Sequence, residues 1–472
     1  MRFQLHATAC LLLLLVQFNR SAMAQAEVDF KKMADLVVQV VDDQQKPVEG
    51  ARVYPYAMRG AEGGGHGYWN DALIGPPKTV VSDANGKAVI QYPVHIGAAT
   101  EPMTTSEVSF QVQHSDFVQQ VVHFRLGPAS AEVTMKPGCE VQLSAVDPDG
   151  NPVPDFAVMM AGPLAPSFWA DDGKGGRRTR AASDGAWQTM IVKPQDDGTA
   201  LFSGVLPLRV RPDQDVKIRN VKLLPGTKIV GSLSDNVPRP VKNGYIIAVS
   251  APKPAENSYA DNDPSLTWHD WSEIKEDGTF ELASIPRGGE LQVIGICDGW
   301  LSSTTIPEAN NHFIMGQLFQ LDKDEPQIEL TLEMERTGSL ELTILQPDGS
   351  PLNAGEVASW PNQLYLKGGS TLLGQRYRSM QFVELQLTPP ESRVRPRREN
   401  MQLPYQGKVV DGKVILSGLP IGRTESLALL HPQLILKSEN AEGEVPFKLD
   451  SPDPKPMTLN TTLPKAAATE KE

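Results

Sequence analysis

Apolar and polar residues alternate along much of this chain. Residues 141–145 (VQLSA) and 340–344 (LELTI) show the pattern clearly. A period of two places successive side chains on opposite faces of a strand, so these segments predict half-buried β-strands. Few stretches have the i, i+3, i+4 spacing of an amphipathic helix. The pattern therefore predicts an all-β protein.

A turn-and-strand motif occurs four times. Each copy has an Asp-Gly or Asn-Gly turn, an alternating strand and a closing proline, a combination typical of a tight turn that enters a strand. The copies are DANGKAVIQYP (83–93), QDDGTALFSGVLP (195–207), KEDGTFELASIP (275–286) and VVDGKVILSGLP (409–420).

A second motif precedes each of these copies. It is a polar turn and a proline, followed at once by Val or Leu and six positions after the proline by Val or Ile. Proline suits a strand entrance where no backbone donor is needed. The four copies align on Pro47, Pro152, Pro240 and Pro351.

The two motifs divide the chain into four repeat units, each with six or seven expected short strands. This is the pattern of a β-sandwich, in which two sheets bury alternate side chains against each other. We place the first to fourth units at 34–135, 136–223, 224–335 and 336–465, with a polar tail at 466–472. The predicted fold is a tandem array of about four Ig-like sandwiches.

Residues 36–94 combine a strand, Pro-Val-x-Gly-Ala-x-Val and Asp-x-x-Gly-x-Ala before the next strand. This combination resembles the carboxypeptidase regulatory-like domain, a transthyretin-like sandwich. The later units are similar in the same motifs, with Asp155, Asn243 and Ala354 at the position of Gly50. The resemblance implies a sandwich fold and secretion. Its motifs specify turns and strand starts, and not chemistry.

Residues 1–24 have the pattern of a secretory signal peptide, with Arg2, an apolar run at 11–16 and a small-residue cleavage site at 22–24. We expect a mature chain from Gln25. The net charge of −13 becomes −15 once Arg2 and Arg20 are removed. The prediction is an exported protein of the periplasm, cell surface or medium. It has no membrane span, and its acidic balance disfavours nucleic acid as a partner.

Two basic runs, 174–180 and 393–398, stand out against this acidic balance. Each contains or adjoins Gly or Pro between expected strands, so we interpret both as solvated loops. Cys139 and Cys297 remain after processing. A single disulfide is possible, but the two cysteines occupy similar strand contexts in different units, which favours buried free thiols.

The histidines do not predict a metal site. His66, His95 and His123 of the first unit lack a tight paired spacing. His114 aligns with Cys297 and His431 of later units, which favours a packing position at a strand end. The acidic turns at 147–150 and 261–263 lack the spaced ligands of a calcium loop. We predict no metal and no cofactor.

Catalytic motifs are also missing from the sequence. It contains no G-x-S-x-G nucleophile elbow, no H-E-x-x-H zinc helix and no Cys/His nucleophile arrangement. The four sandwiches use up the chain and leave no room for a peptidase domain. The predicted function is therefore a non-enzymatic scaffold or interaction protein, whose partner is a protein or polysaccharide of the cell envelope.

Aromatic residues concentrate between the two motifs of each unit. We expect long loop insertions at 54–82, 159–194, 251–274 and 358–408, which hold six of the seven tryptophans. Such loops on a rigid sandwich are common binding sites, and flat rings suit sugar faces. The alternative function is thus carbohydrate binding through Tyr68, Trp69, Trp268 and Trp271. The competing interpretation, which we favour, is that these rings pack at the ends of the sandwiches or between units.

Overall fold

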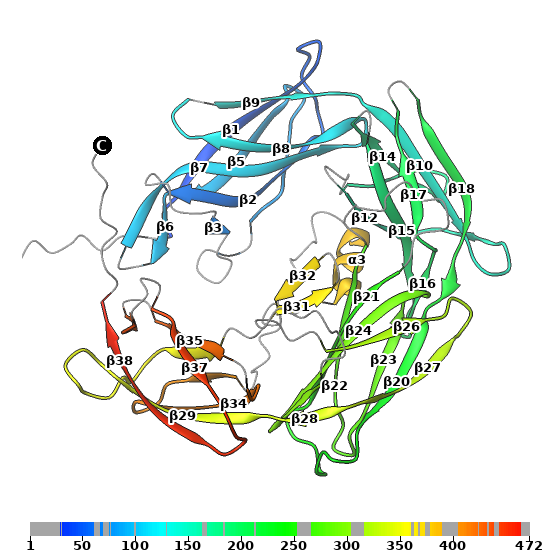
Figure 1. The fold of residues 1–472 in the computed structure, drawn as a ribbon. Helices are drawn as coiled ribbons and strands as arrows, with labels where there is room; N and C mark the ends of the chain where they lie inside the picture. Colours follow the sequence, from blue (N-terminus) through cyan, green and yellow to red (C-terminus); the bar gives the residue numbers. More distant parts are fainter. Residues whose placement is uncertain are drawn as a thin grey trace, which may run out of the picture.

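Figure 1 shows the computed structural model of the chain, in which nearly all regular structure is strand. One helix, α3 (Ser379–Leu387), occurs among the described residues. The all-β prediction is confirmed. The structure describes residues 29–463 except 30, 61–66, 69–74, 76, 99–100, 129, 163–167, 183–184, 212–213, 253–265, 304–315, 360–362, 367–368, 373–377, 389–404, 423, 432–433 and 439–442. The predicted signal peptide and polar tail lie outside these residues.

The first unit packs a small sheet against a larger one. The small sheet has the order β5-β1-β9, and the larger one the order β3-β2-β7-β6, with β4 paired to β2 and β8 to β7. The strands are β1 (Met33–Asp42), β2 (Arg52–Gly60), β3 (Gly67–Tyr68), β4 (Val80–Val81), β5 (Lys87–Pro93), β6 (His95–Ala98), β7 (Glu101–His114), β8 (Phe117–Arg125) and β9 (Ser130–Met135).

The second unit has two five-stranded sheets. One has the order β11-β10-β14-β13 with β18 paired to β10, and the other β12-β15-β16-β19 with β17 paired to β15. The strands are β10 (Cys139–Val146), β11 (Pro152–Val153), β12 (Ala157–Ala161), β13 (Ala170–Asp171), β14 (Arg177–Ala181), β15 (Ala186–Pro194), β16 (Ala200–Phe202), β17 (Leu206–Arg209), β18 (Val216–Lys222) and β19 (Leu224–Pro225).

The third unit repeats the layout of the first, with a small sheet β23-β20-β27 against a larger sheet β22-β21-β24-β25-β28, in which β26 pairs β24. The strands are β20 (Thr227–Leu233), β21 (Tyr245–Ala251), β22 (Trp268–Glu273), β23 (Thr279–Ile285), β24 (Gly289–Cys297), β25 (Trp300–Ser302), β26 (Gln317–Leu321), β27 (Gln327–Leu332) and β28 (Met334–Arg336).

The fourth unit has two four-stranded sheets, β34-β29-β38-β36 and β33-β30-β35-β37, and a separate hairpin, β31-β32. The strands are β29 (Gly338–Leu345), β30 (Glu356–Ser359), β31 (Gln363–Leu366), β32 (Gly369–Leu372), β33 (Gln406–Lys408), β34 (Lys413–Leu419), β35 (Thr424–Leu430), β36 (Ile435–Leu436), β37 (Val445–Lys448) and β38 (Lys455–Thr462).

The four units share one topological feature, the parallel pairing of their first and last long strands. β1 pairs β9, β10 pairs β18, β20 pairs β27 and β29 pairs β38, each in parallel. On the other side of the first strand lies the Asp-Gly or Asn-Gly motif strand in three units, as β5, β23 or β34. In the second unit β14 takes that place, and β16 joins the opposite sheet.

The turn that follows the aligned prolines recurs in the backbone as well. Gly50, Asp155 and Asn243 all have a left-handed φ, of 79°, 54° and 50°. Aspartate and asparagine tolerate this region better than other non-glycine residues, which explains why they replace glycine there. In the fourth unit the left-handed position moves by one residue to Gly355, with φ 111°.

Much of what the structure describes of the predicted long insertions is strand, so the loop interpretation is wrong for these parts, while large stretches of the insertions lie outside the described residues. Residues 54–60 belong to β2, 186–194 to β15 and 268–273 to β22. Six consecutive residues of β15, from Trp187 to Val192, are buried. A strand covered on both faces shows no alternation, and this removed the signal on which the sequence prediction relied.

Hydrophobic cores cross two of the joins between units. One cluster combines second- and third-unit residues such as Phe202 and Trp268 with Val383 of α3. Another combines third- and fourth-unit residues such as Ile294 and Leu340. In the part of the chain that the structure describes, the first unit's cluster and two further second-unit clusters stay within their units. The domain limits themselves stay a prediction.

The units follow one another around an arc in Figure 1, with α3 and the β31-β32 hairpin on its inner side. Both cysteines that the structure describes are buried and free, as the sequence favoured. Burial raises the pKa of the Cys297 thiol to about 11, so this thiol stays protonated and unreactive at neutral pH. No helix in the described ranges is long and apolar enough to cross a membrane.

Candidate functional site

Two of the four predicted ligand-binding aromatics have a described side chain. Tyr68 lies in β3, where its backbone pairs with Ala57 of β2, and nothing further is described of its ring. Trp69 lies outside the described residues. Trp268 and Trp271 both lie on β22, a strand that contacts α3.

Trp268 is a core residue at the join between the second and third units. Its side chain is 1% exposed. The indole meets the ring of Phe202 edge to face, with 4.8 Å between centroids and an interplanar angle of 89°. Such pairs add to the stabilisation that burial itself provides. Because Trp268 offers no ring face to solvent, it serves packing in this structure and not the binding of a sugar.

Trp271 is half-buried and contacts residues of two other elements. The guanidinium of Arg378 lies over its ring at 4.2 Å from the centroid, and Tyr245 of β21 packs edge-on at 6.3 Å. Cations are attracted to the negative face of an indole. The ring face of Trp271 that we expected to bind a ligand is therefore covered by Arg378 of the same chain.

Arg378 is held by a second set of contacts around that ring. Its Nε lies 3.2 Å from Oδ1 of Asp270, and its Nη2 donates to the backbone oxygen of Trp271 at 3.1 Å. The backbone N–H of Trp271 donates in turn to Oδ1 of Asp270 at 2.8 Å. Ion pairs, ring stacking and backbone bonds thus converge on one guanidinium, a geometry that suits Arg far better than Lys.

Arg378 is the N-cap residue that precedes α3, and the sequence explains the short helix. The side chain of Gln381 accepts from the backbone N–H of Arg378 at 3.3 Å, a capping contact at the helix start. Thr388 is extended, with ψ 135°, and Pro389 follows it in the sequence. A residue before proline avoids the helical region, so the helix ends there.

α3 packs its buried face against β12 and β15 of the second unit and β22 of the third, a docking surface that we call the cleft. Val383 is completely buried in their shared core. The hydroxyl of Ser379 accepts from the backbone N–H of His269 on β22 at 2.8 Å. α3 contacts β12, β15 and β22, although it belongs to the fourth unit by sequence.

Gln386 pairs with the edge of the second unit's sheet as a neighbouring strand would. Its Oε1 accepts from the backbone N–H of Val158 at 3.1 Å, and its Nε2 donates to the backbone oxygen of Val158 at 3.2 Å. β12 is an edge strand with β15 on one side only. The carboxamide therefore satisfies a donor and an acceptor that an edge strand leaves unpaired.

The electrostatics of this cleft are set by burial. Burial raises the pKa of Asp270 to about 6, although the backbone N–H of Trp271 and the charge of Arg378 oppose the shift. Burial lowers the pKa of His269 to about 4. At neutral pH Asp270 is therefore ionised and paired with Arg378, while His269 is neutral.

Sequence reasoning missed Arg378, Asp270 and Gln386. The available signal was the segment SMQFVELQL, a stretch without glycine or proline in a chain rich in both. The helical spacing of Ser379, Val383 and Gln386 could have indicated one docking face. Nothing in the sequence, however, placed this segment against strands that precede it by more than a hundred residues.

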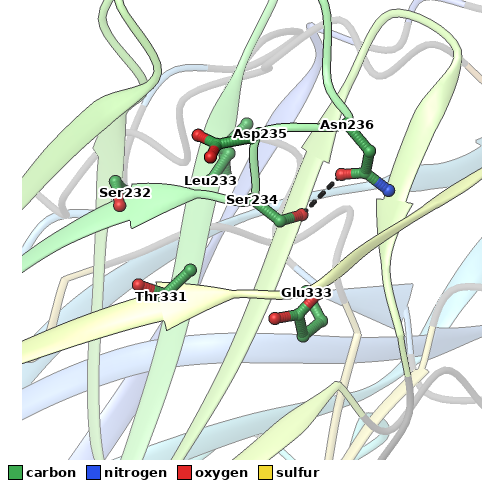
Figure 2. Close-up of a pocket in the computed structure, with 7 residues that line it drawn as sticks. All are labelled: Ser232, Leu233, Ser234, Asp235, Asn236, Thr331 and Glu333. Carbon is green, nitrogen blue, oxygen red and sulfur yellow. Dashed lines mark hydrogen bonds between the residues drawn. The ribbon is translucent and has the colours of Figure 1, made fainter.

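An open hollow of about 520 Å³ lies beside the end of β20. Figure 2 shows the residues that line it. The polar groups that line this hollow form hydrogen bonds within the turn after β20 and with β28. The hydroxyl of Ser234 donates to Oδ1 of Asn236 at 2.7 Å and accepts from the backbone N–H of Met334 at 3.0 Å, and Asn236 donates to the backbone oxygen of Met334. Asp235 and Glu333 remain at its rim, and two carboxylates in an open hollow do not define a binding site.

A serine, a histidine and a glutamate meet in the first unit without the geometry of a catalytic triad. Oγ of Ser109 lies 2.8 Å and Oε1 of Glu107 lies 3.9 Å from the same atom, Nδ1 of His123. A proton relay needs the hydroxyl and the carboxylate on different ring nitrogens. Ser109 is also fully buried, so a substrate has no path to it.

The aligned histidines cap turns. Nδ1 of His114 accepts from the backbone N–H of Asp116, and Nδ1 of His431 accepts from that of Leu434, each at 3.1 Å. This repeated contact gives a structural reason for a polar residue at the strand end. The described residues include no group of three His, Cys, Asp or Glu side chains that could hold a metal ion.

The basic run at 174–180 is not simply a solvated loop, because Arg177–Ala181 form strand β14. Arg178 lies 3.0 Å from Asp116 of the first unit, and Arg180 lies 3.0 Å from Glu140. Thr179 and Ala181 fill the core side of the strand, and small or polar residues give no hydrophobic alternation to detect. The second basic run, 393–398, lies outside the described residues.

No protein-family model and no curated protein matches this chain. It is similar to solved structures of pilins. A streptococcal ancillary pilin is 15% identical over 64% of this chain and 99% of its own, with a TM-score of 0.22. The minor pilin of Streptococcus agalactiae is 13% identical over 52% and 100%, with a TM-score of 0.22. The major pilin subunit of Bacillus cereus is 11% identical over 65% and 100%, with a TM-score of 0.16. At these values the likeness supports no argument about function.

Proposed function

We propose that this chain is an exported, non-enzymatic scaffold or interaction protein of the cell envelope, built of carboxypeptidase regulatory-like β-sandwich repeats. The observation that carries the proposal is the continuity of its cores. Apolar side chains of neighbouring units interpenetrate at two joins, and α3 adds contacts across one of them. Large apolar interfaces between domains oppose relative motion. Units joined in this way can hold binding surfaces at fixed positions relative to one another.

The chemistry of the cleft agrees with a structural role. Asp270 and Arg378 pair with each other, and both bond to the backbone of Trp271. Carbohydrate binding through the four aromatics stays a prediction, since Tyr68 and Trp69 have no described rings. The occupied face of Trp271 and the burial of Trp268 do not favour it.

The test uses the full chain with its own first 24 residues, produced in a bacterial host. We expect the protein in the envelope fraction or the medium, with an amino terminus at Gln25. A photo-crosslinking residue at exposed Val121 or Ile415 should then yield a discrete adduct with an envelope component. The same residue at buried Val357 is the matched control. Retention in the cytoplasm, or no adduct from any of several exposed positions, would contradict the proposal.

A further inference from the structure

The cleft between the second and third units holds α3 and its N-cap residue through specific side-chain contacts as well as through the burial of apolar surface. Val158 and Gln386, which bond to each other, are 228 residues apart in the sequence. α3 has nine residues, and an isolated helix of that length is marginal in water. Its helical form therefore depends on the cleft that receives it.

The cleft offers three subsites in a fixed arrangement. The first binds a guanidinium between the ring of Trp271 and the carboxylate of Asp270. The second is an apolar hole in the shared core that encloses a valine side chain completely. The third is the open edge of β12, which takes a carboxamide at Val158.

These subsites define a ligand class. Arg378, Val383 and Gln386 occupy them in order, so the matching peptide has Arg at the helix start, a β-branched residue five positions later and Gln eight positions later. Each subsite uses a different interaction, and the order of the three fixes the direction of the helix. Helix-in-groove recognition in other proteins uses anchors of this kind.

We propose that this cleft is a peptide-recognition site that the chain fills with its own residues 378–388. Filling in cis is favoured because a tethered segment is present at an effective concentration on the order of millimolar. The site is closed to other peptides while α3 is docked. When substitutions weaken the docking of α3, the site can bind a free peptide with the sequence of α3.

The experiment adds a fluorescent peptide of residues 377–390 to the mature chain and follows its anisotropy. The receptor is the double variant Val383→Asp, Gln386→Ala, which weakens the cis segment in two subsites. Glu384→Gln is the matched control, because Glu384 lies on the exposed side of α3. Hydrogen exchange at the amide of Val158 reports directly whether α3 has left the edge of β12.

We expect saturable binding to the double variant, at least tenfold tighter than to wild type or Glu384→Gln. A peptide with Arg378→Ala should bind the same variant about tenfold more weakly, since it lacks one charge-assisted anchor. If the double variant does not fold, the receptor becomes Arg378→Ala, which changes a half-exposed side chain only. A folded variant with a freely exchanging Val158 amide and no binding would overturn the proposal.

Discussion

Asp270 and His269 are neighbours on β22, and burial shifts their pKa values in opposite directions. The carboxyl titrates near 3.8 when unfolded and near 6 when folded. The folded state therefore holds its proton more tightly, and stability from this group increases as pH falls from about 6 to about 4. The imidazole titrates near 6.5 when unfolded and near 4 when folded, so its contribution decreases over almost the same range. The two dependences offset each other.

Asp270→Asn removes the cost of ionising a buried carboxyl. A shift from 3.8 to about 6 corresponds to an upper bound of about 3 kcal/mol. We expect the variant to unfold at a higher urea concentration than wild type at pH 7.5, and at a similar one at pH 4.5. Tryptophan fluorescence follows the transition, since Trp268 and Trp271 flank the site. A lower midpoint at pH 7.5 would mean that the ion pair with Arg378 outweighs the burial.

His269→Gln should reveal the other half of this balance. At low pH the imidazole of His269 is neutral in the folded wild type and gains a proton when the chain unfolds, which favours the unfolded state. Glutamine has no such proton to gain. We expect the variant's urea midpoint to rise relative to that of wild type as pH falls from 6.5 to 4.5. Parallel midpoints across this range would show that His269 is protonated normally in the folded state.

Residue types alone did not separate a binding aromatic from a packing one. Trp268 and Trp271 lie three positions apart with similar neighbours in sequence, yet one is enclosed by Phe202 of the preceding unit and the other stacks on Arg378. Both partners are distant along the chain. Burial by a distant partner leaves no local pattern, so the structure was needed to place either ring.

Among the elements, the Asp-Gly and Asn-Gly turns test how far the four repeats are equivalent. Gly86 and Gly198 occupy the same motif position, with φ 74° and 83°. A Cβ on Gly86 would lie 2.3 Å from the backbone oxygen of Val40, whereas a Cβ on Gly198 meets nothing within 4 Å. The difference arises because β5 pairs the first strand of its unit, while β16 lies in the opposite sheet.

Gly198→Ala should cost about 1 kcal/mol, the strain of a left-handed alanine. Gly86→Ala should cost about 3 kcal/mol or more, because the turn must also move away from β1. Denaturant unfolding of the two variants beside wild type measures both effects. Equal losses would show that the two turns have the same surroundings, against the topology described above.

The sequence predicted the elements with strong local signals and missed those whose signals are tertiary. Turn glycines and strand-entrance prolines were placed because φ restrictions act on single residues. β14 was missed because Arg, Thr and Ala line it. α3 was missed because only one of its apolar residues, Val383, is fully buried, and the partners Val158 and Asp270 of this segment belong to other units.

At the scale of the whole molecule, the joins are unequal. Apolar cores connect the second unit to the third and the third to the fourth. In the described part of the chain, no buried apolar cluster crosses the join of the first and second units, whose contacts include the Arg178–Asp116 pair and Arg52 at 5.5 Å from the ring centroid of Phe168. Partly exposed ion pairs contribute little stability. The first unit should therefore unfold separately from the rest.

Phe110→Ala and Phe280→Ala form a matched pair for this asymmetry. Both rings are fully buried, one in the first unit's own core and one in the core that crosses the next join. Each substitution should cost about 3 to 5 kcal/mol. In scanning calorimetry we expect two transitions, with Phe110→Ala lowering the Tm of one and Phe280→Ala that of the other. A Phe110→Ala variant that shifts both transitions equally would show that the first unit is coupled to its neighbour as tightly as the other three are to each other.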